Sequence, residues 1–329
     1  MANYIARRFM LALLTIWFIT IISFVIIQLP PGDYVNTYIM ERRAMGGTVG
    51  EEEAEHLREL YGLDKPLYVQ YFKWVGNVIR GKFGWSLTFN QPVSDVIGSR
   101  LGMTIVVSMA AILLTWVVAL PIGIYSAVRQ YSFGDYAFTV FGFMGIAVPS
   151  FLLALLVMYA GFRWFKSDVG GMFSVEYETA PWSWAKLADL LKHLWVPALI
   201  LGLSGTAATI RIMRANLLDE LRKPYVITAR AKGLPERRLI LKYPVRVALN
   251  PFASTVGYML PYVVSGAIIV SLVLSLPTVG PVLLTSLKNQ DMFLAGTIIL
   301  MLSIMTVVGT FLSDMLLLWI DPRIRVEGR

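Results

Sequence analysis

The sequence predicts an all-α integral membrane protein with six membrane-spanning helices. Hydrophobic residues make up 57% of the chain and charged residues only 15%, whereas about a quarter of a soluble domain is charged. Long runs without charge recur along the chain, and a helix needs about 20 apolar residues to cross the hydrocarbon core. The chain has no cysteine, which excludes disulfides, thiolate metal sites and cysteine catalysis.

The first span is expected within residues 1–29, where 9–29 carry no charge and follow Arg7 and Arg8. The apolar run is longer than that of a cleaved signal peptide and does not end at a small-residue cleavage site. We therefore expect it to remain in the protein. A polar external segment follows at 30–100.

Two features of this external segment need an interpretation. Residues 66–81 have the apolar spacing of an amphipathic helix, and their aromatic content fits the membrane interface and ordinary packing equally well. Residues 76–82 match most of a phosphate-binding P-loop. We reject a nucleotide site because Phe83 replaces the Mg²⁺-binding hydroxyl residue and the glycines follow a helical pattern.

Residues 101–329 are expected to form a five-span core. Spans two and three are predicted at 101–128 and 136–162, with Pro121 and Pro149 inside them, where neighbouring helices can satisfy the freed carbonyls. A polar loop at 163–193 leads to a fourth span at 194–210, which continues as a helical pattern over 211–221. The fifth span is predicted at 251–276, a short or re-entrant helix at 281–288, and the sixth span at 292–320.

The positive-inside rule orients this arrangement. The side that holds both termini and the loop at 211–250 carries more Lys and Arg than the other side, and fewer acidic residues. This side is therefore expected in the cytoplasm. The excess of basic charge alone is explained by topology and by attraction to anionic lipid. Nucleic-acid binding is disfavoured because no basic domain with aromatic readout is present.

The cytoplasmic loop contains a short helix with clear boundaries. Pro224 fits its first turn, and Gly233 followed by Pro235 ends it. A helix of about nine residues is unstable alone and needs a surface to pack on. Tyr225, Val226 and Ala229 share one face by their spacing. We expect this helix to be presented to a soluble partner.

The predicted spans show no candidate catalytic or ion-coupling residues apart from Asp314. They lack ionisable residues except Asp314, which lies near the cytoplasmic end of its span, and no catalytic set is visible. His56 and His193 are far apart and are interpreted as loop residues, which disfavours a metal site. A transporter of this kind would need energy from elsewhere. A channel or secondary transporter, a membrane-embedded enzyme and a scaffold for a soluble complex remain alternatives.

The motifs resemble a known family. Residues 225–234 are similar to the cytoplasmic loop of the transmembrane subunits of binding-protein-dependent ABC importers, in the first-permease type of the dipeptide, oligopeptide and nickel branch. The general Glu-Ala-Ala pattern is replaced by Ile227, Thr228 and Ala229. Further segments agree in order: 62–66, 81–86, 276–280 with Asp291, and 321–325.

The resemblance implies a six-helix type I importer permease of a bacterial inner membrane, with no catalytic activity or cofactor of its own. Its expected partners are a second homologous permease, two ATPase subunits and an external solute-binding protein. Peptides are the expected solute, and oligosaccharides or nickel remain open. The short helix would be the coupling helix that docks in the ATPase, through Tyr225, Val226, Thr228, Ala229, Arg230, Ala231, Lys232, Gly233 and Leu234. Basic residues Arg230, Lys232, Arg237 and Arg238 would complement acidic groups on the ATPase.

Overall fold

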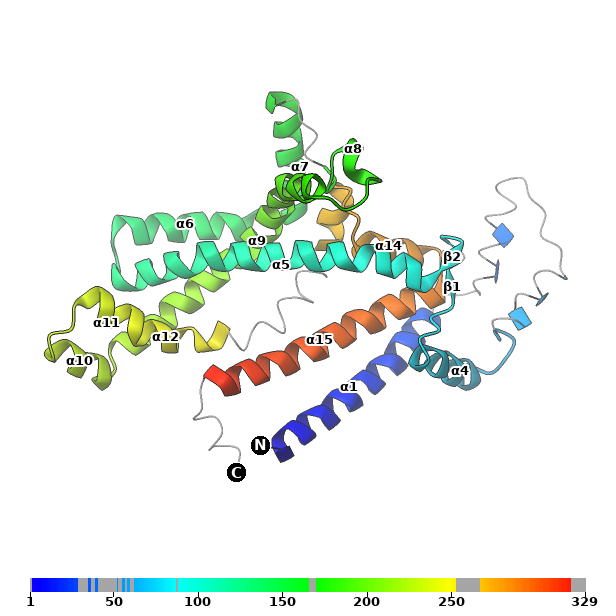
Figure 1. Cartoon of the computed structure of the whole chain (residues 1–329), viewed down its shortest axis with the longest axis horizontal. Helices are drawn as coiled ribbons and strands as arrows, with labels where there is room; N and C mark the ends of the chain where they lie inside the picture. Colours follow the sequence, from blue (N-terminus) through cyan, green and yellow to red (C-terminus); the bar gives the residue numbers. More distant parts are fainter. Residues whose placement is uncertain are drawn as a thin grey trace. The chain divides into compact units, whose positions relative to one another are not determined.

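The computed structural model describes residues 2–28, 35–36, 39–40, 52, 55–56, 58–59, 62–86, 88–165, 170–252 and 267–320. These residues are mostly helical, which confirms the predicted all-α class for the part of the chain described (Figure 1). The chain divides into two compact units. Unit 1 contains Met1–Met103 and Thr278–Val307, and unit 2 contains Thr104–Pro277 and Val308–Arg329.

Four of the described helices are long and apolar enough to cross a membrane. They are α1 (Ala2–Gln28), α5 (Val93–Val128), α9 (Trp184–Leu221) and α15 (Met292–Ile320). These helices contain the first, second, fourth and sixth predicted spans. Three of them, α1, α5 and α9, begin earlier than the charge-free runs, because a charged residue does not end a helix as a proline or a glycine cap does.

The start of α9 corrects the predicted loop at 163–193. Ser183 is the N-cap, and its Oγ accepts a hydrogen bond from the backbone N–H of Lys186 at 3.2 Å. The irregular segment therefore ends at Ser183 in the structure. His193, which was interpreted as a loop residue, lies on α9 instead, where Nδ1 is 2.9 Å from the carbonyl oxygen of Asp189.

The third predicted span is divided into separate helices. α6 (Phe133–Ala147) stops before Pro149, and α7 (Ser150–Ala160) continues into the π-helical η1 (Gly161–Phe165). Pro149 has no N–H to donate and restricts the residue before it, which ends α6. Pro121 and Pro197, by contrast, lie inside α5 and α9. Most of the fifth predicted span, 253–266, lies outside the described residues, and 267–273 are helical.

Unit 1 combines α1 with α4 (Leu67–Ile79), a hairpin of β1 (Trp85–Ser86) and β2 (Gln91–Pro92), and α14 (Val279–Lys288). The helices predicted at 66–81 and 281–288 are confirmed as α4 and α14, and Gly76 lies inside α4 rather than in a strand-to-helix loop. On the α1–α4 contact, the hydroxyls of Thr20 and Tyr71 are 2.8 Å apart. A separate apolar core joins the start of α5 to α14 and α15 through Val93, Ile97, Val279, Leu283, Leu294 and Ile298.

Unit 2 is organised around α9. Gly123 of α5 lies so close to it that an added Cβ would be 2.7 Å from Cβ of Met213, so only glycine fits this contact. α8 (Val175–Glu178) precedes α9. Three short helices follow it, namely α10 (Pro224–Ala231), α11 (Glu236–Lys242) and α12 (Pro244–Ala248), gathered around the C-terminal end of α9 (Figure 1).

Candidate functional site

The ends of α10 are fixed by the residues that the sequence predicted. Pro224 occupies the first turn after the extended N-cap Lys223. At the other end Gly233 has φ +77°, and its N–H donates to the carbonyl of Arg230 at 3.0 Å. The N–H of Leu234 reaches the carbonyl of Ala229 at 3.4 Å. This pair of bonds is a Schellman motif, which satisfies carbonyls that the end of the helix would otherwise leave unpaired.

α10 packs through one face and exposes the other. Val226 is fully buried and Ala229 nearly so, as their spacing predicted. Tyr225 differs from that expectation, because its ring is partly exposed and its hydroxyl donates to Oε2 of Glu220 on α9. Burial and the nearby Glu220 carboxylate raise the pKa of the Tyr225 hydroxyl above its ordinary value. The outward face consists of Ile227, Thr228, Arg230, Ala231, Lys232 and Gly233, and Leu234 is half-buried.

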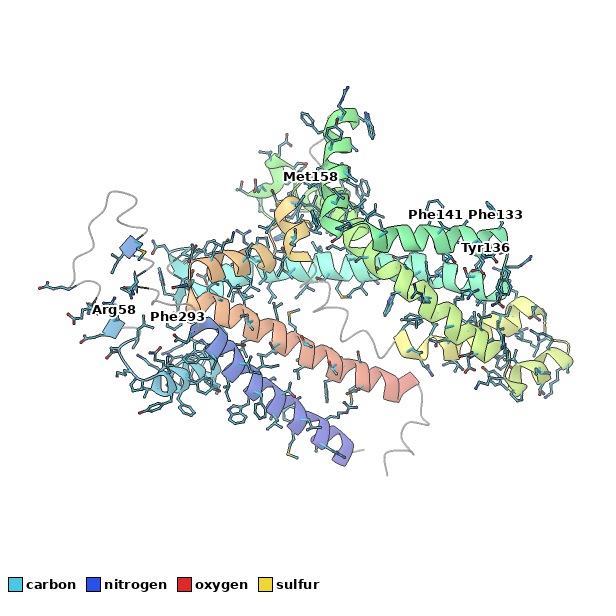
Figure 2. The ribbon with its side chains drawn as sticks, turned by 180° about the vertical axis from the view of Figure 1, so that it is seen from behind. Arg58, Phe133, Tyr136, Phe141, Met158 and Phe293 are labelled. Atoms are coloured by element: carbon cyan, nitrogen blue, oxygen red, sulfur yellow. The ribbon has the colours of Figure 1, made fainter. Side chains whose placement is uncertain are left out.

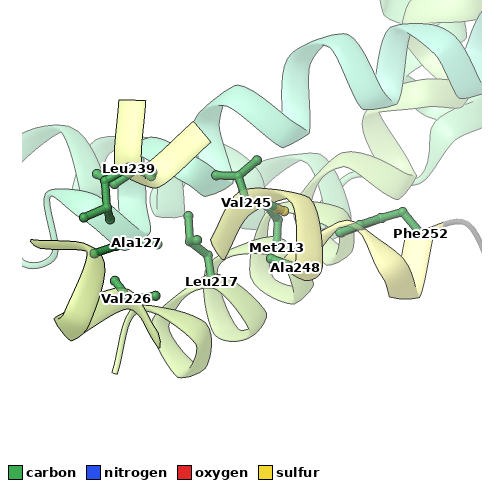
Figure 3. Packing of buried hydrophobic residues seen from close by; sticks show 10 residues of the cluster. Ala127, Met213, Leu217, Val226, Leu239, Val245, Ala248 and Phe252 are labelled. Carbon is green, nitrogen blue, oxygen red and sulfur yellow. The ribbon is translucent and has the colours of Figure 1, made fainter. Parts of the chain in front are cut away.

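The buried face of α10 rests on a core built from four other elements. Met213 and Leu217 of α9 lie at its centre, and neither side chain is accessible to solvent. Leu239 of α11, Val245 of α12 and Ala127 of α5 belong to the same buried cluster as Val226 (Figure 3). A helix of eight residues is unstable alone, so this core holds α10 in place at the end of α9.

One predicted contact residue is already paired within the chain. Arg230 makes a two-pronged ion pair with Glu236 of α11, with Nη2–Oε1 at 2.6 Å and Nε–Oε2 at 3.1 Å. Arg230 lowers the pKa of the Glu236 carboxyl. This pair could not be predicted from the sequence, because residues six positions apart do not share one helix face. Lys232, Arg237 and Arg238 are exposed beside it.

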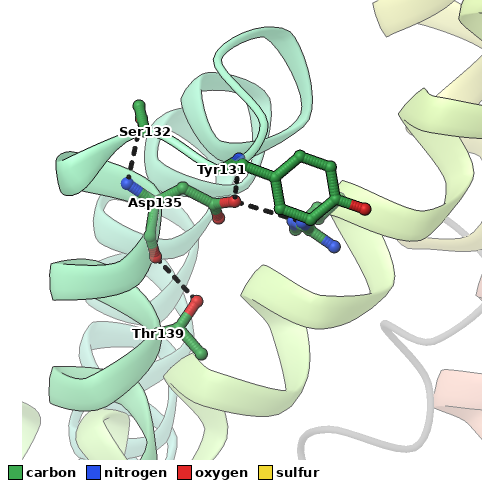
Figure 4. A network of polar contacts seen from close by, with 5 residues as sticks. Tyr131, Ser132, Asp135 and Thr139 are labelled. Carbon is green, nitrogen blue, oxygen red and sulfur yellow. Dashed lines mark hydrogen bonds and ion pairs between the residues drawn. The ribbon is translucent and has the colours of Figure 1, made fainter.

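A second polar contact joins α9 to the first turn of α6 and to the turn before it. Oδ2 of Asp135 accepts hydrogen bonds from Nη2 of Arg214 at 3.1 Å and from the N–H of Tyr131 at 3.0 Å (Figure 4). Asp135 is buried and Arg214 partly exposed. Burial raises the pKa of Asp135, but these donors together lower it below the ordinary value. Ser132 caps the same helix by accepting from the N–H of Asp135 at 3.2 Å.

In unit 1 the structure brings together two sequence motifs that lie far apart in the chain. Ser86 of β1 donates to Oδ2 of Asp291 at 2.6 Å, and Asp291 caps α15 by accepting from the N–H of Leu294 at 3.1 Å. The N–H of Thr88 adds a third bond at 3.3 Å. Burial raises the pKa of Asp291, and these donors oppose the rise. The motifs at 81–86 and at Asp291 thus form one structural feature.

The described residues contain no group of three or more metal-ligating side chains. The candidate site is accordingly a surface, formed by a capped helix that sits on the end of a long helix. A surface of this kind is chemically suited to contact with another protein.

Two family models match the chain. Residues 119–326 match the model described as "Binding-protein-dependent transport system inner membrane component", and residues 1–110 match its N-terminal counterpart. The matched ranges include α6, α9, α10 and α15 in the first case and α1 and α4 in the second.

Curated relatives align over nearly the whole chain. A protein of Brucella ovis that is named as a peptide permease is 36% identical, over 99% of this chain and 100% of its own length. The oligopeptide transport system permease protein AppB of Bacillus subtilis is 34% identical over 98% and 99%. The di/tripeptide transport system permease protein DppB of Pseudomonas aeruginosa is 31% identical over 99% of both. The chain therefore belongs to the family of inner-membrane components of binding-protein-dependent transport systems.

Proposed function

We propose that this chain is a permease subunit of an ATP-driven peptide importer and that α10 is the element on which an ATPase subunit docks. The observation that carries the proposal is the construction of α10. It begins with Pro224 in its first turn and ends in a Schellman motif, it is buried through Val226 and Ala229, and it is exposed over the opposite face. A helix held this firmly with one open face is suited to receive a force from a partner.

The same geometry supports a route for the movement. α9 has 38 residues and a length of about 57 Å at 1.5 Å per residue, enough to cross a membrane and extend beyond it. Met213 and Leu217 link its end to α10 through a fully buried core. ATP binding would draw two ATPase subunits together, move the docked α10, and tilt α9 as a rigid element. This is the alternating-access type of rigid-body transition.

The surface chemistry indicates what the ATPase cleft must offer. Ile227 is 56% exposed at the position where the family pattern has an acidic residue, so an apolar pocket is expected opposite it. We expect acidic groups on the rim of the ATPase cleft, opposite the exposed side chains of Lys232, Arg237 and Arg238. Arg230 contributes less to that rim because Glu236 already pairs with it.

The remaining parts of the proposal concern topology and assembly. We expect six spans. The distribution of basic residues favours an orientation in which both termini and residues 211–250, with α10, lie in the cytoplasm and residues 30–100 lie outside. The translocation path would lie between this chain and a second, similar permease. Two ATPase subunits and an external solute-binding protein would complete the transporter. The names of the relatives support peptides as the solute.

The test is uptake by the complete transporter in vesicles. ATP-dependent accumulation of labelled peptides is expected only when ATPase subunits and binding protein are both present, with competition by unlabelled peptides. Competition by an oligosaccharide or by Ni²⁺ in place of peptides would identify another solute for the same kind of importer. Flux driven by an ion gradient through the chain without ATPase subunits would contradict the proposal and indicate a secondary transporter.

A further inference from the structure

In unit 1, two hydrogen bonds attach α4 to α1 and reach in opposite directions along α1. Nε2 of Gln28 donates to Oε1 of Gln70 at 3.1 Å, and the hydroxyls of Thr20 and Tyr71 are 2.8 Å apart. Gln70 and Tyr71 are neighbours in the sequence, whereas Thr20 and Gln28 lie about 12 Å apart along their helix. One side chain of α4 therefore reaches toward the end of α1, and the next reaches toward its middle.

The two helices cross between these bonds. The centroid of the Phe24 ring on α1 is 5.5 Å from that of Tyr71 and 6.2 Å from that of the buried Trp74. Both views of the chain show α4 lying across the C-terminal end of α1 (Figure 1, Figure 2). Because α1 is long and apolar enough to span a membrane, a helix that lies across it runs in the plane of the membrane.

The crossing lies close to the membrane surface. Gln28 is near the end of the charge-free run at 9–29, and Phe24 precedes it by about 6 Å along the helix. Amphipathic helices that lie on a membrane are buried about 5–10 Å into the boundary between headgroups and acyl chains. The contact with Phe24 therefore places α4 at the depth at which such helices lie.

An apolar stripe on α4 faces the middle of α1. It consists of Tyr68, Phe72 and Ile79, which share one side of the helix and are 67%, 67% and 80% exposed. Tyr68 lies three residues before Tyr71, and the ring centroids of Tyr71 and Phe72 are 5.3 Å apart. The stripe therefore points the same way as Tyr71, toward the apolar length of α1.

The side of α4 that faces the end of α1 is polar. Lys73 and Asn77 follow Gln70 at spacings of three and seven residues, so they share its side of the helix. Lys73 is exposed, and so is Arg80, the C-cap of α4. Helices that lie in the membrane interface have this arrangement, with aromatic and aliphatic side chains on one face and basic side chains on the other.

An apolar notch of about 430 Å³ lies between the stripe and α1. Its walls include Trp17, Ile21, Phe24, Val25, Tyr68 and Phe72. Trp17 lies about 16 Å before Gln28 along α1, so the notch extends from the surface level toward the middle of the helix. Water finds few hydrogen-bond partners on such walls, whereas an acyl chain would bury apolar surface against them.

We propose that α4 lies in the plane of the membrane at the Gln28 end of α1, with its apolar stripe among lipid acyl chains and an acyl chain in the notch. α1 continues the same lipid-facing surface, because Phe18, Ile22 and Val25 share one side of it and are each about half exposed. Val25 also lines the notch. The inference requires only that α1 spans a membrane, and it is independent of the transported solute and of the ATPase.

The experiment uses the purified transporter with cysteine-free partner subunits, since the chain itself has no cysteine. Ile79→Cys and Lys73→Cys each provide one thiol for a bimane fluorophore, the first on the stripe and the second on the polar side of α4. Both positions are exposed, so neither label displaces a packed side chain. The labelled transporters are placed in phosphatidylcholine nanodiscs without the solute-binding protein.

Phosphatidylcholine with brominated acyl chains is expected to lower the bimane emission at position 79 about threefold or more and to leave the emission at position 73 nearly unchanged. Iodide in the surrounding water should quench the label at position 73 and spare the label at position 79. Tyr68→Cys and Arg80→Cys form a second pair, on the stripe and at the polar C-cap, and should repeat this pattern.

Two results would overturn the proposal. Equal quenching by iodide at positions 79 and 73 would show that the stripe faces water, and the loss of that quenching on adding the solute-binding protein would make the stripe a docking surface for that protein. Protection of position 79 from both quenchers would show that another protein chain, and not lipid, covers the stripe.

Discussion

Arg214 of α9 donates a hydrogen bond to the carboxylate of Asp135, 3.1 Å away, in the first turn of α6. The same oxygen accepts the N–H of Tyr131, whose φ of +62° is unfavourable for a residue other than glycine. The carboxylate therefore stabilises a strained turn and attaches it to α9 at the same time. Because α9 also carries α10, this contact connects the α5–α6 turn with the candidate docking surface.

Replacing Asp135 with Asn is expected to destabilise the protein by about 1–3 kcal/mol, because it leaves the partly buried Arg214 without a counter-charge. The measurement is the thermal or denaturant unfolding of the purified chain. Asp95→Asn is the matched control, since Asp95 is an exposed acidic residue in the first turn of α5. Equal stabilities of the two variants would show that the ion pair contributes nothing.

The pH dependence of the same contact has a definite sign. The pKa of Asp135 is lower in the folded protein than its ordinary value of 3.8, so the folded state favours the ionised carboxylate. Its contribution to stability is complete above the unfolded pKa and is lost as the pH falls through the folded pKa. The difference in unfolding free energy between the wild type and Asp135→Asn should stay constant from about pH 8 to 5 and become smaller below about pH 4. If this difference in unfolding free energy became smaller between pH 8 and 6, a group other than Asp135 would be responsible for the pH dependence.

In unit 1, Ser86→Ala is expected to cost about 1–3 kcal/mol, because it removes the shortest of the hydrogen bonds to the buried Asp291. Ser99→Ala is the control. The Ser99 hydroxyl bonds to the carbonyl of Val96 in its own helix, at 2.9 Å, and its loss should change the stability by less than about 0.5 kcal/mol. The measurement is the unfolding midpoint of each variant. A smaller loss of stability in Ser86→Ala than in Ser99→Ala would contradict the prediction.

The cap of α10 can be tested with two glycines that have room for a side chain but differ in backbone conformation. A Cβ at Gly233 or at Gly76 would meet no atom within 4 Å. Gly233 has φ +77°, so Gly233→Ala should destabilise by about 1 kcal/mol, whereas Gly76→Ala inside α4 should stabilise by about 0.5–1 kcal/mol. Opposite signs in thermal unfolding are the expected result, and equal signs would exclude the left-handed cap.

Local signals in the sequence were sufficient for α10, α14 and the four long helices. Pro224 and Gly233 act on their own neighbours, so their effect could be predicted without the fold. The same signal failed for the third span. Pro149 ends α6, while Pro121 is accommodated inside α5, and only the packing around each proline distinguishes the two cases.

The contacts that attach the candidate site to the rest of the chain were not predicted. Asp135 and Arg214 are 79 residues apart, and Ser86 and Asp291 are 205 apart. No periodicity joins residues at such separations, because a helix face relates only residues three or four positions apart. The Ser86–Asp291 contact nevertheless joins two segments that the sequence had already marked as motifs. Their shared function is to form one buried hydrogen-bonded cap.

The central claim is that α10 receives the force of the ATPase, and Ala231→Trp tests it most directly. Ala231 lies on the exposed face, so a bulky side chain there should obstruct docking without disturbing the buried core. Phe133→Trp, at an exposed position of α6, is the control. In the reconstituted transporter, ATP-driven peptide uptake should fall about tenfold or more in Ala231→Trp and remain near wild type in Phe133→Trp, with unchanged unfolding midpoints. Wild-type uptake by Ala231→Trp would contradict the claim.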